Sequence, residues 1–228
     1  MEKRSVEITH KTESRIRVLV MTAVQAEQEA VLLGLQGNPR FEVLVAGVGP
    51  IAAAASTAKA LAKEEYSLVI SAGIGGGFPH ETEVGSLVVA SEIIAADLGV
   101  ETPDGFNSLD ELGFGFTRVP VDLQLAHRVR TAMEKAEVPV KLGPVLTVST
   151  VTGTAASAAK LADRVPGAVA EAMEGFGIAL AAQAAGVPVL EIRAISNAVG
   201  PRDRTAWKIQ EALEVLTAAS SILPEVLV

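Results

Sequence analysis

The chain has 228 residues, of which 49% are hydrophobic and only 20% are charged, so it can bury a sizeable core. Its formal net charge of -8 argues against nucleic acid and anionic membrane surfaces as partners. The lack of cysteine, with only three widely separated histidines, excludes a disulfide scaffold and a cysteine-ligated metal site and argues against a metal enzyme.

The N-terminal residues 1–15 are polar and contain no apolar segment of the kind found in a secretory signal. No apolar run reaches the roughly eighteen residues that a membrane-spanning helix needs. We therefore expect a cytoplasmic protein with a polar leader over residues 1–15, whose order the composition leaves open, and one domain over residues 16–228.

The first half of the chain alternates apolar runs of strand length with helical segments. Strands are predicted at 17–23, 41–48, 67–72 and 87–94, and helices at 27–35 and 50–63. Continuous apolar runs that end in glycine turns and lead into helices are typical of a mostly parallel sheet covered on both faces.

The middle of the chain, residues 97–120, is rich in glycine and proline, which predicts a long loop, and long ordered loops are often functional. The rest of the pattern predicts helices at 122–136, 169–185 and 207–222 and strands at 144–149 and 187–195. We find no internal repeat and no linker, so the pattern predicts a single α/β domain.

Ligands of open α/β sheets bind beyond the carboxyl ends of the strands, and Glu27 lies one short loop past the first strand. A carboxylate buried there has its pKa raised by desolvation, which makes it a usable general base near neutral pH. The alternative is an ordinary glutamate in the first turn of a helix, where it complements the helix dipole. On position alone the alternative is the commoner case.

Residues 73–78, with the sequence GIGGGF, follow the third predicted strand. Without side chains in the way, their backbone N–H groups can reach a phosphate or a sugar. The segment lacks the Lys-Ser/Thr ending of a P-loop and the helix that follows a dinucleotide-binding fingerprint. A plain tight turn explains the glycines equally well.

Met173 and Glu174 lie in a segment that is otherwise apolar and rich in alanine, where we expect the interior of a helix. A carboxylate in a dry core must have partners, and the two vicinal hydroxyls of a ribose are suitable ones. The alternatives are simple core packing for Met173 and an exposed helix position for Glu174.

Four segments in this order, TAVQAE (22–27), SAGIGGGF (71–78), AMEGFG (172–177) and IRAISN (192–197), resemble the nucleoside phosphorylase superfamily. Within it, the chain is most similar to the nucleosidase branch, which includes methylthioadenosine/S-adenosylhomocysteine nucleosidase. The resemblance implies a three-layer α/β/α fold with a central mixed, mostly parallel twisted sheet. It also implies a purine nucleosidase that needs no metal or organic cofactor and that forms a homo-oligomer, most often a dimer.

The resemblance assigns a role to each matching residue. Glu27 activates the hydrolytic water, and Glu174 holds the vicinal hydroxyls of the ribose with Met173 beside it. Asn197 and Ser196 hold the purine and stabilise it as the leaving group. The other substrate-binding candidates are Gly75, Gly76 and Phe78 of the glycine segment, Val151 of the loop at 149–153, and Arg202.

Asn197 departs from the adenine-specific nucleosidases, which have an aspartate at this position. An asparagine cannot give a proton to N7, but its NH₂ group can donate hydrogen bonds to N7 and to a 6-oxo group. Stabilising the developing negative charge with a placed donor is an established form of catalysis. The substitution therefore favours hypoxanthine or guanine over adenine.

Residues 95–106, 145–154 and 191–213 are similar to the futalosine hydrolases in particular. These enzymes of menaquinone biosynthesis release hypoxanthine from futalosine, whose 5′ side bears a benzoate-containing chain. We expect the loop around 97–115 to wrap this chain, and Arg202 or Arg204 to pair with its carboxylate. The alternative is that Arg202 and Asp203 pair with each other and fix the loop.

Three other functions remain open. Asn197 argues against a methylthioadenosine-type nucleosidase. The lack of Lys and Arg at 43–58 and 71–89 argues against a purine nucleoside phosphorylase, which must hold phosphate. The presence of both Glu27 and Glu174 argues against a non-catalytic nucleoside sensor on the same fold.

Overall fold

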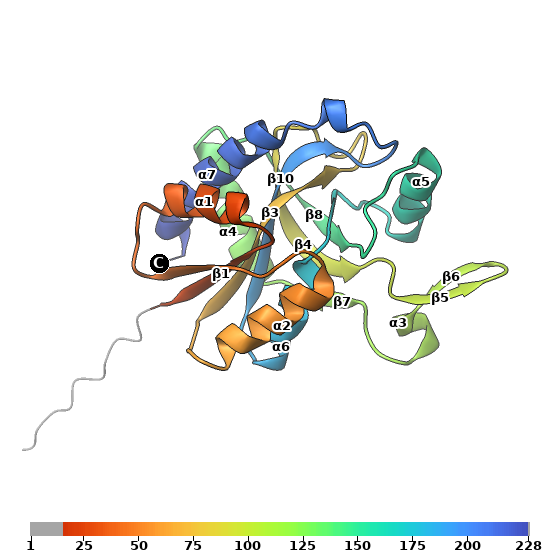
Figure 1. Ribbon diagram of the computed structural model, residues 1–228, viewed down its shortest axis with the longest axis horizontal. Coiled ribbons are helices and arrows are strands. Elements are labelled where there is room, and N and C mark those ends of the chain that lie inside the picture. The colour runs from red at the N-terminus through yellow and green to blue at the C-terminus, as the bar shows by residue number, and fades with distance from the viewer. Residues whose placement is uncertain (1–15, 228) are drawn as a thin grey trace, which may run out of the picture.

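A computed structural model describes residues 16–227, so the predicted leader over residues 1–15 lies outside the described part of the chain (Figure 1). The apolar, β-branched runs form strands, as their composition favours. These strands are β1 (Val18–Thr22), β2 (Phe41–Val45), β3 (Leu68–Gly77), β4 (Leu87–Ala95), β5 (Gly99–Thr102), β6 (Gly105–Ser108), β7 (Arg118–Pro120), β8 (Val140–Thr147), β9 (Ala170–Ala172) and β10 (Val189–Ala198).

The main sheet has eight strands, and most of its pairings are parallel. The strand order is β10-β4-β8-β9-β3-β1-β2, with β7 beside β4. An additional pairing joins β10 to β3, so β3, β10, β4, β8 and β9 form a closed ring from which β1 and β2 extend. Only β10–β4, β3–β9 and β4–β7 are antiparallel, which confirms the predicted mixed, mostly parallel sheet.

Helices cover both faces of this sheet. They are α1 (Gln25–Leu35), α2 (Pro50–Leu61), α3 (Leu109–Leu112), α4 (Leu123–Lys135), α5 (Ala155–Arg164), α6 (Gly175–Ala184) and α7 (Ile209–Val226), with a short 3-10 helix η1 (Arg204–Ala206). Helix α7 packs against α1, α4 and β10, whereas α6 packs against α2 and the opposite side of the strands (Figure 1). The architecture is the expected three-layer α/β/α arrangement.

The core lies between these layers and is built from fully buried aliphatic side chains such as Leu19, Ile70 and Leu190. Burial of each contributes about 1.5–3 kcal/mol relative to exposure. Within residues 16–227, no helix is both long and apolar enough to cross a membrane.

The segment 97–120, predicted as a loop, contains regular structure instead. A hairpin of β5 and β6, joined through Pro103 and Asp104, is followed by α3 and β7. Pro-Asp-Gly is a turn sequence that joins two strands, so these residues mark the tip of the hairpin. In Figure 1 the hairpin projects away from the sheet, so it does not wrap the strand ends of its own chain.

The segment 150–185 also differs from the prediction. Helix α5 was not predicted, although the Thr154 hydroxyl accepts a hydrogen bond from Ser157 N as a helix N-cap does. The expected helix over 169–185 begins only at Gly175, because Ala170–Ala172 pair as β9 with β3 and β8. Tertiary strand pairing overrides the helix propensity of alanine here. Glu174 is therefore the N-cap residue of α6 and does not lie inside a helix.

Two strands are longer than predicted and carry the candidate site. Strand β3 continues through the glycine segment to Gly77, and β10 continues to Ala198. The two run parallel, with a bulge at Ser196 between the pairs Ile195–Gly75 and Asn197–Gly76. The glycines therefore form a strand rather than the tight turn considered above, and their contact with a ligand stays a prediction.

Candidate active site

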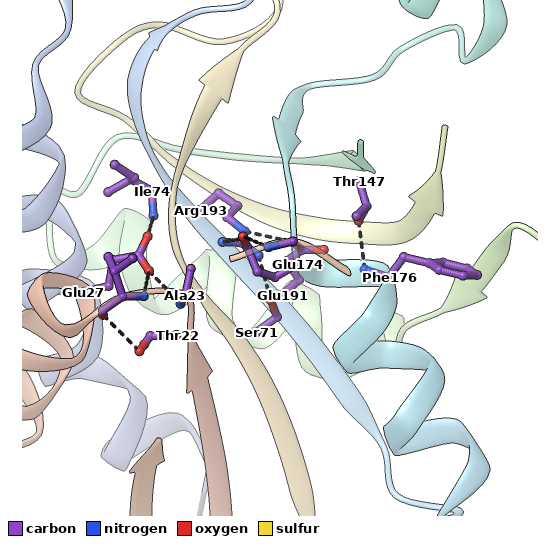
Figure 2. A network of polar contacts seen from close by, with 12 residues as sticks. Thr22, Ala23, Glu27, Ser71, Ile74, Thr147, Glu174, Phe176, Glu191 and Arg193 are labelled. Carbon is purple, nitrogen blue, oxygen red and sulfur yellow. Dashed lines mark hydrogen bonds and ion pairs between the residues drawn. The ribbon is translucent and has the colours of Figure 1, made fainter. Parts of the chain in front are cut away.

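Glu27 is buried at the start of α1, with only 3% of its surface exposed. Its Oε2 accepts hydrogen bonds from Ala23 N at 2.8 Å and Val24 N at 3.2 Å, and its Oε1 accepts one from Ile74 N at 2.9 Å (Figure 2). The carboxylate thus caps the helix and is also buried, while its role as a base stays a prediction. Oε1 accepts a single backbone hydrogen bond and keeps a lone pair for another partner.

Burial raises the pKa of Glu27, while the Arg193 guanidinium and the N–H groups of Ile74 and Ala23 oppose this rise. A carboxyl group with a raised pKa that is also held by donors can take up and release a proton closer to neutral pH. The chemistry available to Glu27 is that of a general base.

Arg193 lies at the centre of a cluster of buried polar side chains beside Glu27. Its Nε donates to Glu191 Oε1 at 2.8 Å, its Nη2 donates to Ser71 Oγ at 2.8 Å, and its Nη1 lies 3.4 Å from Glu174 Oε2 (Figure 2). Arg193 is 1% exposed and Glu191 is fully buried. Burial alone would lower the pKa of Arg193, but the three carboxylates around it raise that pKa above its ordinary value.

The cluster contains more acidic than basic groups, because Arg193 alone faces Glu27, Glu174 and Glu191. Burial also raises the pKa of Glu191, and Arg193 opposes the rise. The second oxygen of Glu191, Oε2, is buried without a hydrogen-bond partner among residues 16–227. A single guanidinium thus holds several carboxyl groups together in the core.

Gly73 explains why the Glu27 carboxylate and the Arg193 guanidinium come so close. A Cβ atom at this position would lie 2.6 Å from Glu27 Oε1 and 2.7 Å from Arg193 Nη1. Any side chain here would therefore displace the carboxylate, the guanidinium or both. The glycine keeps open the space between Glu27 and Arg193.

Glu174 stands beside the same guanidinium and is 5% exposed. Its Oε1 accepts a hydrogen bond from Gly49 N at 3.1 Å, which ties the start of α2 to the start of α6. The exposed helix position considered for Glu174 is thus wrong. Its neighbour Met173 is half-buried and lies outside the apolar core clusters.

Ser196 and Asn197 lie at the end of β10, beside the glycines of β3. The Ser196 hydroxyl lies within hydrogen-bond distance of Asn197 Oδ1 at 2.9 Å and of Gly75 O at 3.2 Å. The contact with Oδ1 orients the amide, so the Asn197 NH₂ group is the donor that points away from Ser196. Asn197 Nδ2 donates one hydrogen to Ala198 O at 3.0 Å and has a second hydrogen to offer.

The buried Glu171 and the half-buried Thr152 form a second polar contact near these strand ends. Glu171, on β9, is 5% exposed, and its Oε1 accepts a hydrogen bond from Thr152 N at 2.9 Å. The Thr152 hydroxyl bonds to the other carboxylate oxygen. Burial raises the pKa of Glu171, and both bonds from Thr152 oppose the rise.

The remaining predicted residues lie at the same end of the sheet. Gly75 and Gly76 are buried in β3. Phe78 packs in the smaller apolar cluster with Leu146, Val148 and Val199 and lines a cavity of about 360 Å³ beside α5. Phe78 thus packs in the core and also lines a cavity, and its contact with the substrate stays a prediction.

Val151 and Arg202 are the most exposed of the predicted residues. Val151 is 36% exposed in the loop between β8 and α5. Arg202 N donates to Gly153 O at 3.1 Å, and the Arg202 guanidinium lies 5.1 Å from the centre of the Trp207 ring. Asp203 accepts hydrogen bonds from Thr205 N and Oγ1 instead, so the considered pairing of Arg202 with Asp203 is wrong.

Arg193, Glu191 and Glu171 were missed from the sequence. The segment VLEIRAI does contain a signal, because residues two apart on a strand share one face and two opposite charges in a buried strand must pair. No Lys or Arg lies within residues 71–89, but Arg193, which is distant in sequence, lies beside Gly73 in the folded chain. Its donors already bind Glu191, Ser71 and Glu174.

Comparisons with known proteins identify the family and the fold of the chain. A model of the phosphorylase superfamily matches residues 4–228. The futalosine hydrolase of Streptomyces coelicolor is 53% identical, over 93% of this chain and 97% of its own, and that of Acidothermus cellulolyticus is 46% identical, over 91% and 90%. The solved structure of futalosine hydrolase from Helicobacter pylori has the same fold, with a TM-score of 0.77 over 92% of this chain and 96% of its own at 16% identity.

Proposed function

Because the chain belongs to the phosphorylase superfamily, we propose that it is a nucleosidase that hydrolyses the N-glycosidic bond of futalosine and releases hypoxanthine. Its identity of 53% with a futalosine hydrolase extends over nearly the whole of both chains. The structural observation that carries the proposal is the placement of Glu27 and Glu174 around one buried guanidinium, because it offers two carboxylates with different surroundings and hence different roles.

Cleavage of a nucleoside passes through a sugar with oxocarbenium character, so charge must be stabilised at the sugar and at the base. Glu27 Oε1 takes the proton of the attacking water, and the bond from water oxygen to C1′ forms as the C1′–N9 bond breaks. Oε2 remains bound to the N–H groups of Ala23 and Val24, which hold the carboxylate in place.

Glu174 binds the ribose in this proposal. Gly49 N already binds Oε1 of its carboxylate and Arg193 already binds Oε2. Each oxygen keeps a lone pair for a sugar hydroxyl. Arg193 acts through both glutamates without meeting the substrate itself, since it lowers the pKa of Glu27 and forms an ion pair with Glu174. Met173 supplies an apolar side chain next to the sugar.

Asn197 stabilises the base as it leaves with the electron pair of the broken bond. Its oriented NH₂ group donates to N7 or to the 6-oxo group. Hydrolysis is favoured over phosphorolysis because Arg193, which lies beside the glycine strand, is buried and bound to carboxylates. An anion-binding arginine would need donors free to face the ligand.

The protein is also proposed to be a homo-oligomer. Ile51 at the start of α2 is 86% exposed, and Phe114 in the segment between α3 and β7 is 80% exposed. These two side chains offer apolar surface to a partner subunit, and symmetric homo-oligomers are the commonest assemblies of soluble proteins. Light scattering after size-exclusion chromatography measures the mass, and a monomer at micromolar concentration would contradict this assignment.

The experiment that tests the function is hypoxanthine release from futalosine in phosphate-free buffer, with methylthioadenosine and inosine measured alongside. Rapid release from futalosine without phosphate is expected. A preference for methylthioadenosine, or turnover that requires phosphate, would contradict the proposal and indicate another branch of the superfamily.

A further inference from the structure

Two residues of β10 and two of β3 form a square on one face of the sheet. Glu191 is the register partner of Ser71, and Arg193 is the register partner of Gly73. Register partners, and residues two apart on one strand, point to the same face of a sheet. The square therefore has a carboxylate, a guanidinium and a hydroxyl at three corners and no side chain at the fourth.

The guanidinium of Arg193 is held mainly by one of its edges. Its Nε donates to Glu191 Oε1 and its Nη2 donates to Ser71 Oγ, both at 2.8 Å, and these two nitrogens form one edge of the planar fork. The remaining nitrogen, Nη1, makes only the longer contact of 3.4 Å with Glu174 Oε2. The two short bonds thus fix the guanidinium on the side of Glu191 and Ser71.

Glu191 is itself fixed in place. It is fully buried, and a Cβ atom at Gly175 would lie 2.3 Å from each of its carboxylate oxygens, so the carboxylate lies directly against the start of α6. Its Oε2 has no hydrogen-bond partner within residues 16–227. A buried ion pair can often be replaced by apolar side chains without loss of stability, so stability alone does not account for a carboxylate at this position.

The corner without a side chain lies between Arg193 and Glu27. Arg193 Nη1 and Glu27 Oε1 both lie within 2.7 Å of the position that a Cβ atom of Gly73 would take. In the described part of the chain, the guanidinium makes its hydrogen bonds to Glu191, Ser71 and Glu174, and it acts on Glu27 through its charge. Gly73 places no side chain between the two groups, so a guanidinium released from its anchors would be free to close onto Glu27.

We propose that Glu191 is a positioning residue that holds the Arg193 guanidinium back from Glu27 and keeps Glu27 Oε1 free to accept a proton from water. This inference rests on the proposed function, in which Glu27 is the base. A hydrogen-bonded ion pair with Arg193 would occupy that oxygen and favour the ionised carboxylate, which would make Glu27 a weaker base. Glu191 is buried away from the substrate and acts through Arg193.

The charged groups of this cluster come from α1, β10 and the start of α6. Arg193 and Glu174 act on Glu27, and the same two groups act on Glu191. Glu174 is also held by Gly49 N. A substitution at Glu191 should therefore change the surroundings of Glu27 through a movement of Arg193.

The test measures the pH dependence of kcat/KM for futalosine in Glu191→Leu, which removes the acceptor for Nε of Arg193. Since a hydrogen-bonded guanidinium lowers the pKa of a carboxyl group, the acid limb should move to lower pH by about one unit. The value of kcat at the plateau should fall about 3- to 10-fold because the base is weaker. Glu191→Gln keeps an acceptor for Nε and should retain most of the wild-type kcat and limb. A purely structural role would lower the melting temperature and leave the limb in place.

Ser71→Ala makes the same test with a smaller change to the core. It removes the acceptor for Nη2 of Arg193 and retains Glu191, so the acid limb should move in the same direction but by less. Ser67→Ala, at an exposed position just before β3, is the matched control and should leave the limb unchanged. Thermal melts show which variants are folded, and Ser71→Ala decides the outcome if Glu191→Leu does not fold.

Infrared titration of the free enzyme gives a second readout that needs no turnover. The difference between the spectra of each protein and those of its Glu27→Gln version isolates the carboxyl band of Glu27, whose midpoint should move to lower pH in Glu191→Leu. A midpoint that moves in protein that does not cleave futalosine would overturn the proposed function and support this inference. Cleavage of futalosine with an unmoved limb and midpoint in the folded variants, or with a limb that moves without the midpoint, would overturn the inference and leave the function standing.

Discussion

The two ends of the candidate site are built in different ways. At the sugar end, Glu27, Glu174 and Arg193 are each no more than 5% exposed and are carried by strands and by the first residues of helices. At the base end, Asn197 is half-buried, and Val151 and Arg202 lie on exposed segments. The groups proposed to hold or move charge are thus fixed by the core. The groups proposed to recognise the substrate lie at the end of β10, as Asn197 does, or on exposed segments, as Val151 and Arg202 do.

This difference has a physical reason. Interactions with charged groups strengthen in a medium of low dielectric constant, so a base and its partners work best where water is excluded. Recognition elements on loops can change without disturbing the core. Substitutions at the sugar end should therefore alter turnover and stability, and those at the base end should alter selectivity and KM.

The largest effect is expected for Glu27→Gln. The variant cannot take a proton from water, so kcat should fall by about 10²- to 10⁴-fold, while substrate binding measured by calorimetry is largely retained. Glu29→Gln, at an exposed position of the same helix, should retain wild-type kcat. A Glu27→Gln variant with more than a tenth of wild-type kcat would rule out Glu27 as the base.

Arg193→Met should cause the largest loss of stability. It leaves the buried carboxyl groups of Glu191 and Glu174 without their cation, and breaking a buried pair in this way costs about 3–5 kcal/mol of unfolding free energy. Chemical denaturation measures this loss. Arg202→Met, at an exposed position, should change the free energy by less than about 0.5 kcal/mol.

The double variant Glu191→Leu with Arg193→Met sharpens the result. Removing one carboxyl together with the guanidinium should restore part of the stability, because fewer buried charges remain unpaired. If the double variant were no more stable than Arg193→Met alone, the unpaired Glu191 carboxyl would not account for any of the lost stability.

The pH dependence of kcat/KM should reflect the raised pKa of Glu27. Only the ionised carboxylate can act as base, so activity should fall on acidification through a pKa above 4.5, the ordinary value for glutamate. Since Arg193 lowers the pKa of Glu27, folded Arg193→Met should show the fall at still higher pH. An acid limb at or below 4.5 would contradict the assignment.

The raised pKa of Glu27 also determines how its contribution to stability depends on pH. A raised pKa means that the folded state binds the proton more tightly than the unfolded state does. The contribution of Glu27 is therefore present in full below the unfolded pKa and is lost as pH rises through the folded pKa.

The smallest effect is expected for Arg202→Ala. If the guanidinium pairs with the carboxylate of the 5′ chain, KM for futalosine should rise by up to about fivefold, as is usual for an exposed ion pair. KM for inosine, which lacks that carboxylate, should not change. Steady-state kinetics on both substrates measure this, and unchanged KM values in Arg202→Ala and Arg204→Ala would remove the hypothesis.

Much of the fold could be predicted because buried parallel strands are continuous apolar runs, as at Val18–Thr22 and Leu87–Ala95. Strand β9 could not, because three residues with the sequence Ala-Glu-Ala carry no strand signal of their own and depend on pairing with Gly76 and Thr147. That error also placed Glu174 inside a helix and hid Glu171.

The position of Glu27 after the first strand predicted a buried carboxylate, and its burial is confirmed. The roles of Asn197 and the other site residues came from the family resemblance and stay predictions. Arg193 was missed because its partners come from four separate segments, and only the folded chain brings Ser71 and Glu174 to it. The opposite charges of Glu191 and Arg193 could be recognised in the sequence. They indicate only that the two side chains pair, and not which other groups contact them.

The closed ring of strands has a consequence for how the protein reaches its working state. Ring closure pairs β3 with β10, and through it Arg193 meets Ser71, 122 positions earlier in the chain. Contacts between such distant segments form late and slow the folding of a domain. A nascent chain that has not yet produced β10 therefore lacks the guanidinium around which the glutamates gather, and activity should return during refolding no sooner than the last cooperative step.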